Sequence, residues 1–326
     1  MANAAVYGRL QKKVWEGSIP LSIRLSPAEC RTYDDSDPYL IQCPRLSYLP
    51  FLLPRIRAFF ASSLIDPEVQ AHDGWFAFES LPLKWHLPVG LLYDLFSGAE
   101  PASSSADPAR GHESRHDEHT GDKKNDNDTE TLPWKLVVHF TDWPEDQLIK
   151  LDEDGKVIQD AFINGVKEAD FLRNGSARVV MGLSKDDSTT LWESVEKHDL
   201  NLFNNINNKL LNPPGTSLRH IPLKVYLPTT PATSTPADSG PSANSAGSLR
   251  VVQSLVTPFL PSKQPQTLGT ALNALLPSVF PSRRNPILAQ AVLHGTVMPL
   301  AATMEELLRV AAYPDGFLHI AIVMMG

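Results

Sequence analysis

The sequence predicts an α+β protein in which two similar strand-and-helix halves flank a helical middle. Three observations lead to this fold class. Two segments of low complexity separate from the rest of the 326-residue chain. Outside them, strand and helix patterns follow the same order in the first and last parts of the chain, although no residue-level repeat is visible. The part between these halves has helical apolar spacing.

The two low-complexity segments lack the apolar residues needed for a packed core. In residues 98–131, four alanines are the apolar content, and nine acids against four bases give a net charge of −5. Residues 228–248 contain four prolines, nine Ser or Thr residues and one charge. Such compositions cannot offset the entropy cost of ordering, so we expect a disordered acidic insert and a flexible linker.

The first half, residues 15–150, has the order β-β-α-β-β-α-β. Alternating apolar residues over Trp15–Leu25 predict a hairpin with its turn at Glu16-Gly17-Ser18. The patterns that follow predict a helix over Tyr48–Leu64, strands over Trp75–Phe78 and Leu83–Leu87, a helix over Val89–Phe96 and a strand over Trp134–Phe140.

The second half, residues 216–326, repeats that order closely. The predicted elements are strands over His220–Leu227 and Arg250–Val256, a helix over Leu268–Leu276, a strand over Ala291–Val297 that turns at His294-Gly295, a helix over Met304–Ala312 and a strand over Phe317–Met325. Two strands, a helix across the sheet and further strands form the ubiquitin-like roll, or β-grasp. We therefore expect two ubiquitin-like domains.

The middle part, residues 151–215, is predicted to be a helix-rich domain. Helical apolar spacing runs from Val157 to Leu172, and Asn174-Gly175 provides a stop signal. A second helical pattern covers Leu191–Leu211 and ends before Pro213-Pro214-Gly215.

Composition argues against several classes of function. The formal net charge of −8 argues against nucleic-acid binding, and no apolar run is long enough for a membrane span. Cys30 and Cys43 are too few for a disulfide framework, and no phosphate-binding, nucleophile-elbow or dinucleotide motif is present. We expect a cytoplasmic protein with no cofactor, no metal site and no catalytic residue of its own.

Two short motifs suggest chemistry that their context does not support. The run from His112 to His116 matches H-E-x-x-H, but a zinc peptidase needs this motif on a helix, and here it lies in the acidic insert. Ubiquitin-like modifiers end in glycine on an extended tail, whereas Gly326 directly follows the last predicted strand. We interpret the first as a solvated loop and the second as an ordinary chain end.

Lys167 is one of 14 lysines and a candidate modification site. It lies mid-helix at the edge of the apolar face, flanked by the acids Glu168 and Asp170. Gly165 lowers helix propensity by about 1 kcal/mol relative to alanine, which we interpret as clearing space beside the amine. An accessible amine in such a setting suits a modification acceptor, although a solvated surface lysine is the simpler reading.

Five strings resemble the autophagy protein 5 family and occur in family order. They are CPRLSYL (Cys43–Leu49), PLKWHLPVGLLYDL (Pro82–Leu95), WKLVVHF (Trp134–Phe140), VKEADFLRNG (Val166–Gly175) and YPDGFLHIAIV (Tyr313–Val323). The resemblance covers essentially the whole chain outside the two inserts. It implies two ubiquitin-like domains around a helix-rich domain, with a short N-terminal helix over residues 1–14.

The same resemblance implies a function. Autophagy protein 12, itself ubiquitin-like, is joined by an isopeptide bond to the lysine of the K-E-A-D string, which here is Lys167. The N-terminal helix of autophagy protein 16 binds a groove of the acceptor. The assembly acts as an E3-like ligase, working with a separate E2 to attach autophagy protein 8 to phosphatidylethanolamine. This implies peripheral membrane contact at the preautophagosomal structure or phagophore.

For the partner helix, we expect contacts with Arg45 and with the stretch from Trp85 to Gly90, because glycine lets a partner backbone approach closely. Trp85 in the core and Gly90 at a helix start are the alternatives. For the whole protein, the alternative function is an adaptor that uses its ubiquitin-like domains for noncovalent binding without conjugation.

Overall fold

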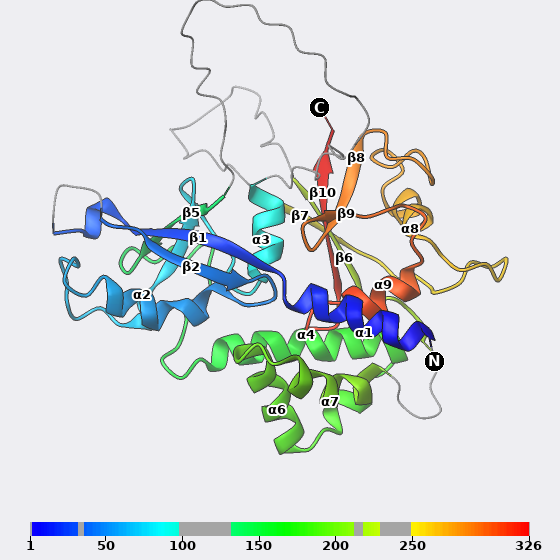
Figure 1. Cartoon of the computed structure of the whole chain (residues 1–326), viewed down its shortest axis with the longest axis horizontal. Helices are drawn as coiled ribbons and strands as arrows, with labels where there is room; N and C mark the ends of the chain where they lie inside the picture. Colours follow the sequence, from blue (N-terminus) through cyan, green and yellow to red (C-terminus); the bar gives the residue numbers. More distant parts are fainter. Residues whose placement is uncertain (1, 32–35, 98–131, 212–217, 229–248, 326) are drawn as a thin grey trace, which may run out of the picture.

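The computed structural model describes residues 2–31, 36–97, 132–211, 218–228 and 249–325. The acidic insert, the linker beyond Pro228, the 112–116 histidine motif and Gly326 lie outside the described residues. Two five-stranded sheets and a group of helices make up the described part of the chain (Figure 1). The predicted α+β class is therefore confirmed.

The first sheet has the strand order β2-β1-β5-β3-β4. Its strands are β1 (Ser18–Leu25), β2 (Tyr39–Pro44), β3 (Trp75–Phe78), β4 (Leu81–Pro82) and β5 (Trp134–His139). β1 pairs antiparallel with β2 and parallel with β5. Alternate residues of β1, from Ile19 to Leu25, are buried because successive side chains of a strand point to opposite faces. Helices α2 (Leu53–Phe59) and α3 (Val89–Phe96) complete this half.

The hairpin predicted over Trp15–Leu25 is wrong. Trp15 ends helix α1 (Ala2–Trp15), and β1 is one continuous strand whose antiparallel partner is β2. The indole of Trp15 is buried against Phe203 and His198, and its Nε1 donates a hydrogen bond to the His198 carbonyl at 3.0 Å. The tryptophan therefore packs on the helix-rich part of the chain, which the local alternation could not indicate.

Two further predictions for the first half need correction. The helix predicted over Tyr48–Leu64 begins as a 3₁₀ turn at Leu49–Leu52, and α2 ends at Phe59. The strand predicted over Leu83–Leu87 is a turn-containing loop, and β4 covers Leu81–Pro82 instead. Leu83, Trp85 and Leu87 are buried there, so their apolar alternation reflects burial outside a regular strand, although Leu83 N donates to the Phe76 carbonyl of β3 at 2.8 Å.

The second sheet repeats the topology of the first, with the order β7-β6-β10-β8-β9. Its strands are β6 (Leu223–Pro228), β7 (Leu249–Gln253), β8 (Ala289–Leu293), β9 (Thr296–Val297) and β10 (Leu318–Met324), and its helices are α8 (Leu268–Leu275) and α9 (Met304–Ala311). β6 and β10 form the parallel central pair, as β1 and β5 do. The turn at His294-Gly295 is confirmed, with both residues at positive φ.

The helix-rich part contains α4 (Lys156–Asn174), α5 (Arg178–Met181), α6 (Lys185–Glu196) and α7 (Leu200–Leu211). Helix α4 ends as predicted, with Gly175 in the left-handed conformation and its N–H bonded to the Phe171 carbonyl at 2.7 Å. The single pattern over Leu191–Leu211 is two helices. His198 has a φ of +55° and breaks the pattern between α6 and α7.

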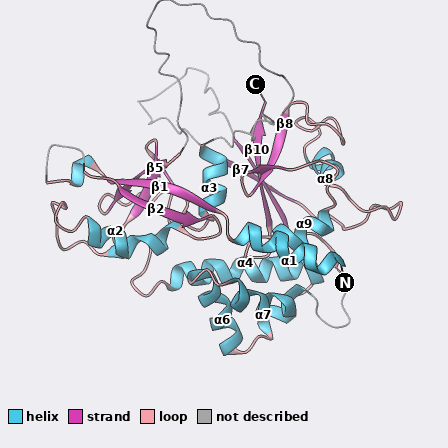
Figure 2. Ribbon diagram, viewed as in Figure 1, coloured by secondary structure: helices cyan, strands magenta, loops and turns pink. Residues whose placement is uncertain are grey.

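Helix α3 lies between the two sheets and contacts both β2 and β10 (Figure 2). The N-terminal helix α1 packs on α9 of the second half, and Gln11 of α1 bonds Asn204 of α7 at 3.0 Å. Buried residues from all three parts form one connected core. Side chains from the two halves and the helix-rich part are therefore positioned together.

Candidate functional site

Lys167 lies on the exposed side of α4, the longest described helix. On the opposite side, Phe162, Val166 and Ala169 are buried. This arrangement follows from the helical period, which places residues three and four apart on one face. The amine of Lys167 lies 3.5 Å from Asn164 Oδ1 and takes part in no ion pair with a described residue. The predicted exposure of Lys167 is confirmed, although the residue lies away from the buried face and not at its edge.

The next residue, Glu168, ties α4 to the second sheet. Its carboxylate accepts hydrogen bonds from Lys224 Nζ of β6 and Gln253 Nε2 of β7, both at 2.9 Å. Burial raises the pKa of Glu168, but these two donors outweigh it and hold the pKa below its ordinary value. The residue next to Lys167 therefore contacts two strands of the second sheet.

Gly165 does not clear space for Lys167. A Cβ on Gly165 would lie 3.3 Å from the Cβ of Asp315, which belongs to the loop before β10. Asp315 in turn contacts His319 Nε2 at 2.7 Å, and His319 Nδ1 contacts the Tyr226 hydroxyl at 2.8 Å. The glycine thus permits close packing between α4 and the second half of the chain.

Arg45 and Gly90 form an internal contact in the described chain. The Gly90 N–H donates to the Arg45 carbonyl at 2.8 Å, and a Cβ on Gly90 would lie 2.7 Å from the Arg45 Cβ. The close approach that we expected for a partner backbone is made by Arg45 itself. The Arg45 guanidinium donates to the Gly90 carbonyl at 3.0 Å and forms a short ion pair with Asp94.

Asp94 makes a structural contact that the sequence reasoning missed. It is 2% exposed, and its second carboxylate oxygen accepts a hydrogen bond from Gly295 N at 2.8 Å. Arg45, Asp94 and Gly295 therefore join the first half of the chain to the second. The signal for this contact was a single acid in the otherwise apolar helix VGLLYDLF.

Trp85 is 5% exposed and is held by its own chain. Its indole N–H donates to the Ile149 carbonyl at 2.8 Å, and Leu148 and Leu151 line the same apolar pocket. Arg45, Trp85 and Gly90 are thus buried residues that shape the surrounding surface, and they do not protrude from it.

Apart from the exposed amine of Lys167, we considered metal-binding clusters, membrane-spanning helices and reactive thiols among the described residues. Among them, no three His, Cys, Asp or Glu side chains gather as a metal-binding cluster, and no helix is long and apolar enough to cross a membrane. Burial raises the pKa of the Cys43 thiol to about 12, which keeps it protonated.

Two sheets of identical topology, each with a parallel central pair, and a helix-rich part between them define a protein with two ubiquitin-like domains. Family models agree with this assignment. Residues 14–140 match Autophagy protein ATG5, UblA domain; residues 155–213 match its alpha-helical bundle region; and residues 220–322 match its UblB domain. The chain belongs to the autophagy protein 5 family.

Relatives match the chain along its whole length. It is 55% identical to autophagy protein 5 of Phaeosphaeria nodorum and 52% identical to that of Aspergillus terreus, with all of each chain covered. The crystal structure of Kluyveromyces marxianus ATG5 aligns with a TM-score of 0.69 over 97% of this chain and 99% of that one. At 19% identity, this last likeness shows the fold alone.

Proposed function

We propose that Lys167 is the residue through which this chain is conjugated. As an autophagy protein 5 family member, the chain is the acceptor of autophagy protein 12 and a non-catalytic component of the E3-like complex that includes autophagy protein 16. The choice of Lys167 is supported by its position on the surface of the chain. Lys167 is exposed on α4, and the adjacent Glu168 is fixed to two strands of the second sheet.

The reaction needs an amine that can reach the thioester and has space around it, and the lysine ammonium must lose two protons, one before the attack and one as the amide forms. The neutral Nζ attacks the thioester carbonyl that joins the terminal glycine of autophagy protein 12 to an E2 cysteine. The new C–N bond is an isopeptide, the C–S bond breaks, and the E2 thiolate leaves while the amine gives up its proton. Desolvation by the docked E2 favours the neutral amine. This chain supplies the nucleophile and its orientation.

For autophagy protein 16, we propose that its N-terminal helix binds near the junction of the first half with the second. Arg45, Trp85 and Gly90 would form the supporting floor of that surface. Their burial supports an indirect role, because each is already engaged within the chain.

The assembled complex would promote transfer of autophagy protein 8 from its E2 to phosphatidylethanolamine, at the phagophore membrane. Contact with the membrane would be peripheral. An adaptor that binds only noncovalently is the alternative.

A reconstituted conjugation reaction separates the two functions. The full chain is incubated with autophagy protein 12, its E1-like and E2-like enzymes, ATP and magnesium, and the product is analysed by tryptic mass spectrometry. We expect the C-terminal tryptic remnant of autophagy protein 12 in isopeptide linkage on Lys167, and no adduct for Lys167→Arg. Lys156→Arg is the matched control, because Lys156 is an exposed lysine on the same helix.

A remnant on another lysine would contradict the assignment of Lys167 but would still support conjugation to autophagy protein 12. Absence of any adduct from the folded chain would favour the adaptor.

A further inference from the structure

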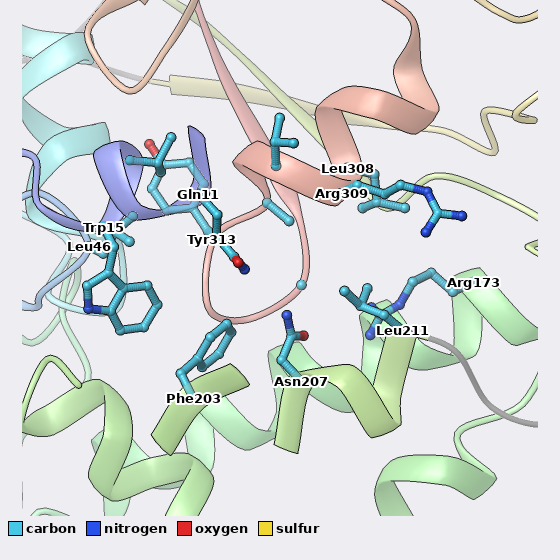
Figure 3. A pocket seen from close by; sticks show the side chains of 14 residues that line it. Gln11, Trp15, Leu46, Arg173, Phe203, Asn207, Leu211, Leu308, Arg309 and Tyr313 are labelled. Atoms are coloured by element: carbon cyan, nitrogen blue, oxygen red, sulfur yellow. The ribbon is translucent and has the colours of Figure 1, made fainter. Parts of the chain in front are cut away.

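The pocket between α1, α7, α9 and the loop before β10 is packing space and not a ligand site (Figure 3). Trp15, Phe203 and Leu308, from three different helices, line it, and its volume of about 20 Å³ has room for one or two water molecules. The surface of the second ubiquitin-like domain, by contrast, has a charged and apolar patch that no internal contact explains.

Part of this domain is basic although the chain as a whole is acidic. Residues 249–304 contain four Lys or Arg residues and no Asp or Glu, whereas the whole chain has 29 bases, 37 acids and a net charge of −8. All of these residues are described, so the charges can be placed in the fold. Segregation of positive charge on one part of an acidic chain favours a partner of negative charge.

Three of the four bases lie on two exposed loops beside helix α8. The first loop, residues 257–266, leads into α8 and carries Lys263, and the second, residues 281–288, follows α8 and carries Arg283 and Arg284. The Arg283 carbonyl packs against the first turn of α8. In Figure 1 both segments, here called the α8 loops, lie at the right-hand margin of the molecule, on the side away from the first sheet.

The basic side chains of the α8 loops have no acidic partner. Lys263, Arg283 and Arg284 are exposed, and none of them forms an ion pair with another described residue. Arg283 donates a hydrogen bond from Nε to Asn273 Oδ1 of α8 at 3.0 Å, which holds the second loop on the helix. The three positive charges are therefore available to an external anion.

Exposed apolar side chains accompany these cations in the same loops. Phe259 is 50% exposed, Ile287 is 55% exposed and Leu288 is 44% exposed. Large apolar groups beside Lys and Arg are typical of a surface that lies on a membrane, because the apolar groups enter the acyl boundary while the bases contact anionic headgroups. Nucleic acid also attracts cations, but it binds through stacking on aromatic rings and offers aliphatic side chains no comparable environment.

The backbone of the α8 loops also suits contact with lipid. In the first loop, the N–H groups of Leu260 and Lys263 donate to the carbonyls of Gln264 and Leu260 at 2.9 and 2.8 Å. The two loops also contain prolines, which have no N–H, at Pro258, Pro261, Pro265, Pro281 and Pro286. Both features reduce the number of backbone donors that would lose water at a membrane, where an unsatisfied donor is costly.

We infer that the α8 loops are the surface through which this chain contacts a membrane rich in anionic lipid. The three bases bind the negative headgroups, and the three exposed apolar side chains enter the boundary between headgroups and acyl chains. The inference rests on the peripheral membrane contact of the proposed function and gives that contact a location. It does not involve Lys167, which belongs to α4.

Vesicle flotation of the full, unconjugated chain tests this surface. We expect the chain to float with vesicles of equal parts phosphatidylserine and phosphatidylcholine, and far less with phosphatidylcholine alone. Each base near an anionic leaflet strengthens binding about five-fold, so Lys263→Gln with Arg284→Gln should weaken it about 25-fold. Added salt should weaken binding as well, because salt screens exposed charges. Phe259→Ser with Ile287→Ser should weaken binding but leave its salt dependence.

The matched control is Arg55→Gln with Lys135→Gln, because both are exposed bases of the first half of the chain. The control should float like wild type, and all these variants should keep the wild-type thermal unfolding midpoint, because the substituted side chains are exposed.

Equal flotation with the two kinds of vesicle, or flotation that the α8-loop variants do not weaken more than the control, would overturn the assignment of this surface. No flotation with either vesicle would overturn it together with the membrane contact in the proposed function. Conjugation at Lys167 is measured without membranes, so its outcome is independent of this one.

Discussion

Arg45 and Asp94 form a buried ion pair that links the first ubiquitin-like domain to the second. Arg45 is 9% exposed and Asp94 is 2% exposed, and the carboxylate reaches onward to the backbone of Gly295. The bond to Gly295 crosses between two domains that are far apart in sequence. The pair is therefore a structural joint, and its loss should affect the whole fold.

Removing one partner of this joint should strongly destabilise the chain. Asp94→Asn or Arg45→Met leaves a buried charge without compensation, which costs about 3–5 kcal/mol of unfolding free energy. Urea unfolding followed by circular dichroism would measure this loss of unfolding free energy. Glu16→Gln breaks an exposed pair with Lys12 and should change little. An Asp94 variant as stable as wild type would show that the joint is dispensable.

Acid should weaken the fold through His294. Burial lowers the pKa of His294 to about 4, whereas an unfolded histidine titrates near 6.5. Between these values the unfolded chain binds a proton that the native chain does not, so stability falls as pH drops from about 6.5 toward 4. The slope for one such group is at most ~1.4 kcal/mol per pH unit.

Urea midpoints at pH 7.5 and 5.0 would measure this loss. His294→Asn tolerates the positive φ of the position and should show a smaller loss than wild type. An equal loss in both chains would assign the acid sensitivity to other groups.

The packing of α4 on the loop before β10 should not tolerate a large residue at Gly165. Gly165→Leu inserts a side chain against Asp315 and should lower the unfolding free energy by about 1–3 kcal/mol. Gly8→Leu is the matched control on α1, because a Cβ there meets nothing within 4 Å. That change should be neutral or stabilising, since leucine has better helix propensity than glycine. Equal effects of the two substitutions would argue against the close packing.

The orientation of the acceptor lysine should depend on Glu168. Glu168→Lys places a cation beside Lys224 and removes both hydrogen bonds to the second sheet, so we expect a reduced conjugation rate and a small fall in the thermal unfolding midpoint. The swap Glu168→Lys with Lys224→Glu should recover part of the rate, because it restores the opposite charges. A single variant that conjugates at the wild-type rate would show that the anchor has no effect on Lys167.

Local patterns in the sequence were sufficient for most elements of the fold. The second half was predicted element by element, because its strands and helices each have a clear period and definite turn residues, such as His294-Gly295. The wrong predictions arose where the same apolar pattern is compatible with more than one structure. Trp15 alternates with β1 but packs on α7, and the apolar run over Leu191–Leu211 contains a break at His198.

The order of elements, the exposed position of Lys167 and the relationship to autophagy protein 5 could be predicted from the amino-acid sequence, because they depend on local periodicity and on long strings of residues. The packing of separate elements was needed to reveal the roles of Gly90 and Gly165, the Arg45–Asp94–Gly295 joint and the burial of Arg173. Asp94 and Gly295 are 201 residues apart in the chain. A contact of that kind has no local signature, because it forms only when separate elements pack together.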